Sequence, residues 1–315
     1  MIEGKALAGP NRIERDVATQ SIRSRIRRAL RMPTGIRRPG FVRNVLMRNL
    51  PWNFEFIAGR NSRTNFPILA LMRIRDEELL IQDSLDHVST FADGIIVFDD
   101  SSTDETVAIV AKHPAVVEII RNKKWKSTER HWEETANRRL LLNRSRRFSP
   151  TWIFYCDADE RFEGEIRGYL LEKCPASVSA IRVSLLDAYM TKDDHAAFAP
   201  GDNLLNFRRS FGPERRDIIM AWRPSPTTEY FVPDSREPIV GQGDIETRFW
   251  CQHYGKSLSI EQWEATCDYY IANFPENYRV KWQARKGKAI HIQSDFGAPL
   301  MSWADAKKKC YLLDQ

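Results

Sequence analysis

The stretch Trp152-Ile-Phe-Tyr-Cys-Asp157-Ala-Asp159-Glu160-Arg161-Phe162 decides the fold of this 315-residue chain. Its four bulky residues predict a strand that is buried on both faces and ends at two carboxylates, Asp157 and Asp159. Because side chains alternate along an extended chain, both carboxylates are expected on the same side. Such clustered negative charge needs a counter-ion, which Mg²⁺ or Mn²⁺ would supply while binding a phosphate. The alternative is a helix N-cap followed by an acidic first turn.

Composition places the chain among ordinary globular proteins, with 42% hydrophobic and 29% charged residues. No run of about 18 apolar residues and no secretory signal is present, so we expect a cytoplasmic protein. Five cysteines without C-x-x-C spacing argue against a zinc site or a disulfide framework. The net charge of +6 favours an anionic partner such as a nucleotide diphosphate.

Residues 1–65 form a basic N-terminal extension in which eleven arginines follow Asp16 and weak helical spacing begins at Ile22. A basic amphipathic helix of this kind is typical of peripheral contact with an anionic membrane, here the inner membrane face. A solvated lead-in or a helix packed on the main domain is the alternative.

Strand and helix patterns alternate from residue 66 onward. Apolar strands are expected at 67–72, 94–98 and 116–120, with helices at 79–88, 107–112 and 132–142. This alternation predicts an α/β fold with a mostly parallel sheet flanked by helices. We place the main domain at 66–256.

The C-terminal part is less regular. Strands are expected at 179–186, 204–209 and 218–222, the last two antiparallel, and a helix at 259–271 opens a C-terminal helical segment, 257–315. Prolines and glycines between 224 and 243 mark a long irregular stretch.

Acidic pairs close two of the predicted strands, because Ile96-Val-Phe-Asp99-Asp100-Ser-Ser-Thr-Asp104 ends one and Asp157 and Asp159 end the other. Strand ends of a parallel sheet meet in one crevice. These two segments, in this order and spacing, resemble the hydrophobic-DDGSTD and D-x-D motifs of family 2 glycosyltransferases of the GT-A type. The resemblance covers roughly residues 66 to 165, and weakly the segment to 256.

The resemblance implies an inverting sugar transfer from a nucleotide-sugar donor, a UDP-sugar, with Mn²⁺ or Mg²⁺. Asp100 would hydrogen-bond the uracil ring, and Asp99 would shape that pocket. Asp157 would bind the ribose or the metal through water, and Asp159 the metal directly. The metal would neutralise the leaving diphosphate.

Further site residues are less strongly marked. Arg73 and Arg75 are candidates for contacts to the nucleotide, with surface salt bridging as the alternative. His253 resembles a histidine that closes the metal or phosphate site in related enzymes, and a structural histidine is the alternative. The nearby Lys256 is a candidate phosphate contact. Six acids are candidates for the general base, with Asp217 favoured: Asp187, Asp193, Asp194, Glu214, Asp217 and Glu229.

Two departures from the family pattern are visible. Ser101 replaces the glycine of the DDGS turn, and Arg75-Asp76-Glu77 replaces an Asn-Glu turn, which leaves the contacts to the base open. Trp125, Trp132 and Trp222 are candidate sugar platforms, although core packing is commoner for tryptophan.

Rival functions are a nucleotidyltransferase and a non-enzymatic basic module that binds membrane or nucleic acid. The first would favour a glycine-rich loop after the first strand, and residues 73–78 contain no glycine. The second lacks a zinc finger, RNP or helix-turn-helix pattern, so no nucleic acid is expected. We therefore expect a glycosyltransferase that acts on a glycan or lipid-linked acceptor, as in cell-surface polysaccharide synthesis.

Overall fold

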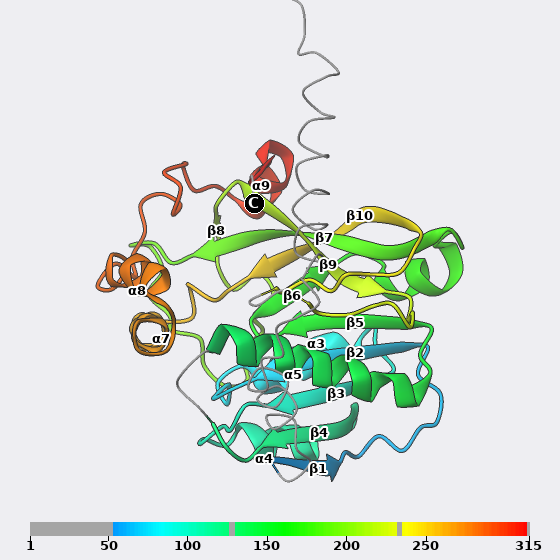
Figure 1. Ribbon diagram of the computed structural model, residues 1–315. Coiled ribbons are helices and arrows are strands. Elements are labelled where there is room, and N and C mark those ends of the chain that lie inside the picture. The colour runs from blue at the N-terminus through cyan, green and yellow to red at the C-terminus, as the bar shows by residue number, and fades with distance from the viewer. Residues whose placement is uncertain (1–52, 126–129, 232–234, 314–315) are drawn as a thin grey trace, which may run out of the picture. The chain divides into compact units, whose positions relative to one another are not determined.

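The computed structural model describes residues 53–125, 130–231 and 235–313 (Figure 1). Residues 51–315 form one compact unit. The expected membrane contact of the N-terminal extension falls mainly on residues 1–52, which lie outside the described residues. Among the helices that are described, none is both long and apolar enough to cross a membrane.

Four parallel strands form the centre of the sheet. In spatial order they are β4 (Val116–Asn122), β3 (Gly94–Asp99), β2 (Ile68–Ile74) and β5 (Trp152–Asp157). Nearly every residue of these strands is buried, as continuous apolar runs covered on both faces require. The expected α/β fold with a mostly parallel central sheet is confirmed.

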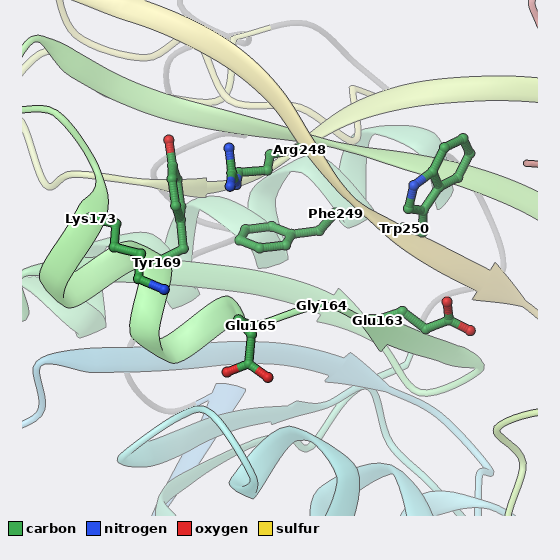
Figure 2. A pocket seen from close by; sticks show the side chains of 8 residues that line it. All are labelled: Glu163, Gly164, Glu165, Tyr169, Lys173, Arg248, Phe249 and Trp250. Atoms are coloured by element: carbon green, nitrogen blue, oxygen red, sulfur yellow. The ribbon is translucent and has the colours of Figure 1, made fainter.

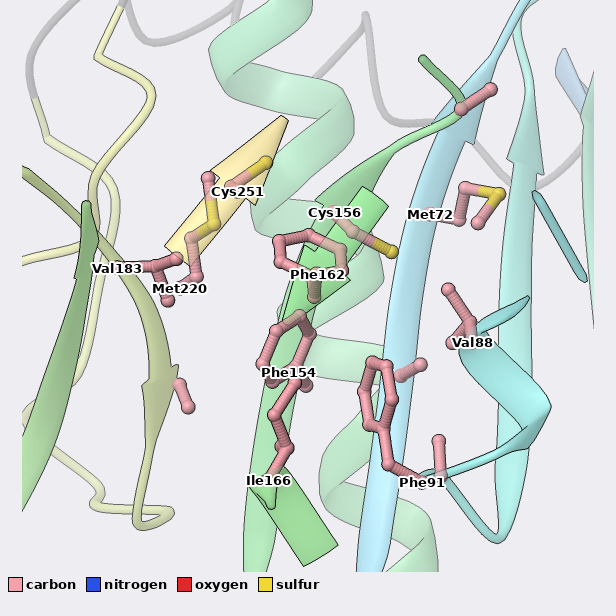
Figure 3. Close-up of a cluster of buried hydrophobic side chains, with 14 of the residues drawn as sticks. Met72, Val88, Phe91, Phe154, Cys156, Phe162, Ile166, Val183, Met220 and Cys251 are labelled. Atoms are coloured by element: carbon pink, nitrogen blue, oxygen red, sulfur yellow. The ribbon is translucent and has the colours of Figure 1, made fainter. Parts of the chain in front are cut away.

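Helices cover both faces of this sheet (Figure 1). Helices α3 (Ile81–Ser89) and α4 (Thr106–Lys112) pack on one face, and α5 (Arg130–Ser145) packs on the other. The first face carries the larger apolar core, where aromatic rings of β5 and its neighbours interlock (Figure 3). The rings of Phe91 and Phe154, for example, have centroids 4.8 Å apart. This double covering fixes the strand ends relative to one another.

Further strands extend the sheet on both sides, mostly through antiparallel pairs, with β10 and β7 paired in parallel. Strand β1 (Phe54–Ala58), from the predicted N-terminal extension, pairs with β4. Beyond β5 the order continues through β9 (Glu214–Trp222), β7 (Val178–Tyr189), β10 (Asp244–His253) and β6 (Glu160–Glu163). The strand expected at 218–222 is confirmed within β9, which runs antiparallel to β5 and β7.

The strand expected at residues 204–209 was wrong, because this segment is a turn. Arg208 is buried, and its guanidinium donates to the carbonyl oxygens of Ala196, Ser257 and Leu258. A buried guanidinium needs several acceptors, and the chain bends around this side chain to supply them. The apolar run alone could not reveal this demand.

The helix expected at 259–271 is present as α7 (Ile260–Asn273), where the Ser259 side chain accepts from the Gln262 N–H. It packs against α8 (Glu276–Gln283). Shorter elements complete the described chain: η2 (Arg146–Phe148), α6 (Ile166–Gly168), η3 (Tyr169–Lys173), β8 (Ser210–Phe211), α9 (Trp303–Lys309) and β11 (Tyr311–Leu312). The domain boundary at 256 stays a prediction.

Candidate functional site

The two acidic strand ends lie on either side of β2. In the sheet register Ile74 pairs with Asp99 of β3, and Arg73 pairs with Asp157 of β5. Neighbouring strands lie about 4.8 Å apart, so the two strand ends are separated by roughly 10 Å. The parallel sheet thus brings both acidic pairs to one edge, as strand ends of α/β sheets are arranged around ligands.

The loops after β2 and β3 are joined by hydrogen bonds. Asp76, whose φ is +51°, donates its N–H to Ser102 Oγ (2.9 Å) and accepts from the Thr103 N–H (2.7 Å). Ser101 has a φ of +65° at the position where the family motif has glycine, and its hydroxyl donates to the Asn122 carbonyl. Asp76, from the altered turn, therefore shapes the loop that carries the first acidic pair.

Asp99 and Asp100 are both completely buried. Asp99 accepts from the Ser102 N–H (3.0 Å), and burial raises the pKa of its carboxyl group. Asp100 accepts from Asn122 Nδ2 (3.0 Å) and from Arg130 Nη2 at the start of α5. Both oxygens of Asp100 are thus bound by the chain's own side chains, so a base could reach them only after Arg130 moves.

Arg73 and Arg75 point to different places. Arg73 lies 3.7 Å from Asp100 Oδ2 and 3.2 Å from Glu134 Oε1 of α5, and its Nε is buried without a hydrogen-bond partner. The Arg75 guanidinium stacks over the Trp125 ring, 4.0 Å from its centroid. The side chain of Arg73 therefore faces Asp100 and α5, whereas Arg75 lies beside Trp125.

Arg236 supplies a cation at the end of β5. Its Nη2 lies 3.1 Å from Asp157 Oδ2 and also contacts Glu160 Oε1, while Asp157 Oδ1 is buried without a hydrogen-bond partner. The Asp157 N–H donates to Glu160 Oε2 (2.9 Å). A guanidinium therefore provides the positive charge that the sequence predicts beside Asp157.

Asp159 faces His253, at the end of β10. The Asp159 Oδ2 lies 3.2 Å from His253 Nε2, and His253 Nδ1 lies 2.7 Å from Asp187 Oδ1. Burial opposes the charged forms, but the ion pair outweighs it, lowering the pKa of Asp159 to about 2 and raising that of His253 to about 9. The imidazole is thus held between two carboxylates.

Gly255 and Glu77 close this side of the crevice. A Cβ at Gly255 would lie 2.7 Å from Asp159 Oδ2, so only glycine leaves that carboxylate free space. Burial, and then the negative charges of Asp159 and Asp157, raise the pKa of Glu77. A bound cation would relieve this repulsion among the carboxylates.

The Asp159–His253 pair is the candidate site for a divalent cation. Because Nδ1 lies against Asp187 and Nε2 lies 3.2 Å from Asp159, a metal would bind there only by displacing the proton of Nε2 and separating this ion pair. No preformed group of three or more such ligands is found among the described residues. Two protein ligands would leave most coordination positions to the phosphates and water, as Mg²⁺ and Mn²⁺ sites on nucleotides do.

Two of the six candidate bases, Asp187 and Asp217, lie in different surroundings. Asp187 is bound by His253, by Lys256 Nζ (2.6 Å) and by Arg216, and these cations lower its pKa well below the usual range although burial opposes them. Asp217 accepts from Ser184 Oγ (2.9 Å) and pairs with Arg215. Its described contacts include none of the other predicted site residues.

Several residues of the crevice had no signal in the sequence. Arg236 comes from the irregular stretch between β9 and β10, and Arg130 and Glu134 come from α5. The clustered carboxylates predicted that counter-ions must exist but not which arginines supply them. No sequence pattern marks Arg130, Glu134 or Arg236 as a partner of these carboxylates.

A separate hollow of ≈ 420 Å³ lies along β6 and β10 (Figure 2). Its lining includes Tyr169, Phe249 and Trp250, and Phe249 has a strained φ of +67°. Gly164 makes room for the Phe249 ring, since a Cβ there would lie 2.8 Å from it. None of the predicted site residues lines this hollow.

Comparison with known proteins gives limited further information. No family model matches the chain. Two uncharacterized mycobacterial proteins, Mb3815c of Mycobacterium bovis and Rv3786c of Mycobacterium tuberculosis, are each 35% identical over 100 residues. That match spans 31% of this chain and 25% of each relative, so only about a quarter of the relatives' length is matched.

A solved structure with a related arrangement is the mannosyltransferase PcManGT from Pyrobaculum calidifontis in complex with GDP-Man and Mn²⁺. The alignment covers 73% of this chain and 72% of that chain, at 13% identity and a TM-score of 0.34.

Proposed function

We propose that the chain is a metal-dependent glycosyltransferase that binds a nucleotide-sugar donor across the edge of β2. The observation that carries the proposal is that two acidic strand ends, Asp99/Asp100 and Asp157/Asp159, lie at the same edge of the sheet on either side of β2. His253 faces Asp159 there. Apolar packing gives no reason to gather these groups at one sheet edge. A diphosphate held through a cation gives such a reason.

In this proposal Asp159 and His253 hold Mn²⁺ or Mg²⁺, which neutralises charge on the diphosphate leaving group. Asp187 fixes the imidazole so that Nε2 faces Asp159. The guanidinium of Arg73, with an unbound buried Nε, is placed to donate to a phosphate. Asp100 would contact the base if Arg130 withdraws, and Arg75 with Trp125 would border that pocket.

The general base is assigned to Asp217 rather than Asp187. Three cations bind Asp187 and lower its proton affinity, so we assign it to positioning His253. Because β9 runs antiparallel to β5, Asp217, near the start of β9, lies toward the end of the sheet that carries Asp157. Exchange of Asp217 for asparagine should lower kcat while leaving donor affinity within about twofold.

Donor identity is tested by calorimetric titration with a panel of UDP-sugars and GDP-mannose, with Mn²⁺ or with EDTA. The expected result is Mn²⁺-dependent binding of one donor, with an affinity at least tenfold weaker in Asp159→Asn. Glu172→Gln, an exposed carboxylate of η3, serves as the matched control and should bind like the wild type. Equal binding by Asp159→Asn would refute the metal site, and no binding of any nucleotide sugar would refute the function.

A further inference from the structure

Residues 276–296 combine exposed apolar side chains with a concentration of positive charge. Val280, Ile290, Ile292 and Phe296 are exposed by 56%, 41%, 89% and 58%. The same segment contains five lysines and arginines against two acids, a net charge of +3: Arg279, Lys281, Arg285, Lys286 and Lys288 against Glu276 and Asp295. We call the four apolar residues and these five cations the 276–296 patch.

The two isoleucines are held outward by a fixed backbone. The ring of His291, between them, packs edge-on against the rings of Tyr189 and Trp263, at centroid distances of 4.9 and 5.5 Å respectively. The backbone N–H of His291 donates to the Met190 carbonyl (2.8 Å). Ala289 is also buried. With Ala289 and His291 packed inward, the intervening Ile290 and the following Ile292 are left facing the solvent. Their exposure is therefore built into the fold.

The remaining face of this region is a packed aromatic core. The rings of Tyr270 and Trp282 stack with centroids 4.4 Å apart, and Trp263 packs 5.8 Å from Trp282. This core holds α7 and α8 together at the side of the sheet where β10 ends (Figure 1). Apolar residues of the segment thus divide into a buried set and an exposed set, and the exposed set has no partner among the described residues.

Positive charge in the patch is only partly compensated. Arg279 pairs with Glu276, Arg285 pairs with Asp295 (2.6 Å), and Lys286 pairs with Asp268. Lys281 has no ion-pair partner among the described residues, and its pKa is lowered by burial and by the charges of Arg285, Lys256 and Arg216. An anionic surface would relieve this crowding of cations.

We propose that the 276–296 patch docks the protein onto an anionic lipid bilayer. Aliphatic and aromatic side chains would enter the headgroup region while the lysines and arginines contact anionic lipids, the combination that interfacial membrane binding requires. A partner protein would explain the apolar residues but gives no reason for the surrounding excess of cations, so the bilayer is the better match.

A consequence, which rests on the proposed function, concerns the acceptor. Arg285 of the patch pairs with Asp295, which also binds Lys256 Nζ (2.6 Å). Lys256 in turn binds Asp187, the partner of His253. The patch is therefore joined to the proposed metal site by one chain of ion pairs. Docking would set that site close to the bilayer, where a lipid-linked acceptor is available.

Vesicle co-sedimentation of the full chain tests the docking. Vesicles of phosphatidylcholine alone and with 30% phosphatidylglycerol are compared at low and high salt. The expected result is at least about tenfold tighter partitioning with the anionic lipid, reduced at least about tenfold in Ile292→Ser/Phe296→Ser. Ile245→Ser/Leu312→Ser, with side chains exposed by 46% and 52% elsewhere, should stay within about twofold of the wild type.

The double variants also separate the patch from the basic residues 1–52, which are unchanged in both. If Ile292→Ser/Phe296→Ser sediments like the wild type, the proposal is overturned. It is also overturned if that variant instead converts a dimer into a monomer by light scattering without changing lipid binding. Nucleotide-sugar titration on the same samples keeps the outcome separate from the proposed function, because soluble donor binding needs no bilayer.

Discussion

Removing the charge of Asp100 should destabilise the protein severely. The side chains of Asp100 and Arg130 are both 0% exposed and are in direct contact, with Arg73 3.7 Å away. In Asp100→Asn the amide oxygen can still accept from Asn122, so the loss is mainly that of the negative charge. Breaking a buried ion pair from one side leaves an uncompensated charge and costs about 3–5 kcal/mol.

The assay is urea unfolding followed by circular dichroism, with Glu172→Gln on the exposed surface as the control. A loss of 3–5 kcal/mol would be a large part of the roughly 5–15 kcal/mol that stabilises a typical domain. In a double-mutant cycle with Arg130→Met, we expect a coupling energy of about 1–3 kcal/mol. If Asp100→Asn loses less than about 1 kcal/mol, the buried pair is not structural, and a direct ligand-binding role for Asp100 becomes the better explanation.

Three further predictions concern pH, the metal site and the core. Burial lowers the pKa of His87 from 6.5 to about 4, and its Nε2 accepts from the Phe162 N–H. The unfolded chain takes up this proton at a higher pH, so the unfolding free energy should fall by up to about 3 kcal/mol between pH 6.5 and 4. His87→Gln should flatten that fall, and an unchanged pH profile would exclude His87 as its origin. Gly255→Ala should weaken Mn²⁺ binding at least about tenfold in calorimetric titration, because the new Cβ would lie 2.7 Å from Asp159 Oδ2; unaltered binding would place the metal elsewhere. Leu71→Ala, at the centre of β2, should cost about 2–5 kcal/mol in urea unfolding, and a much smaller cost would mean that the site can collapse around the missing side chain.

The backbone conformation beside Asp99 and Asp100 explains two positions at which the chain differs from the glycosyltransferase motif that it resembles. Ser101 takes the left-handed conformation that the motif's glycine adopts readily, and a hydroxyl bond to the Asn122 carbonyl offsets part of the strain. Asp76 binds the opposite loop through Ser102 and Thr103. Ser101 and Asp76, the residues that differ from the motif, therefore help to hold the two loops in their folded conformation.

The sequence by itself determined the sheet and the kind of chemistry at its edge. Apolar runs at 67–72, 94–98 and 152–155 could only be satisfied by burial on both faces, which predicts a parallel sheet between layers of helices. Carboxylates placed directly after two such runs must then lie at one edge, because parallel strands end on the same side.

Only the tertiary structure decided which cations meet those carboxylates. Arg236 reaches Asp157 from an irregular stretch, Arg130 reaches Asp100 from α5, and Arg208 turns an expected strand into a bend. A long guanidinium side chain can approach its partner from many backbone positions, so local pattern does not fix the pairing. Ion pairs between distant segments depend on how those segments pack, and that packing exists only in the folded chain.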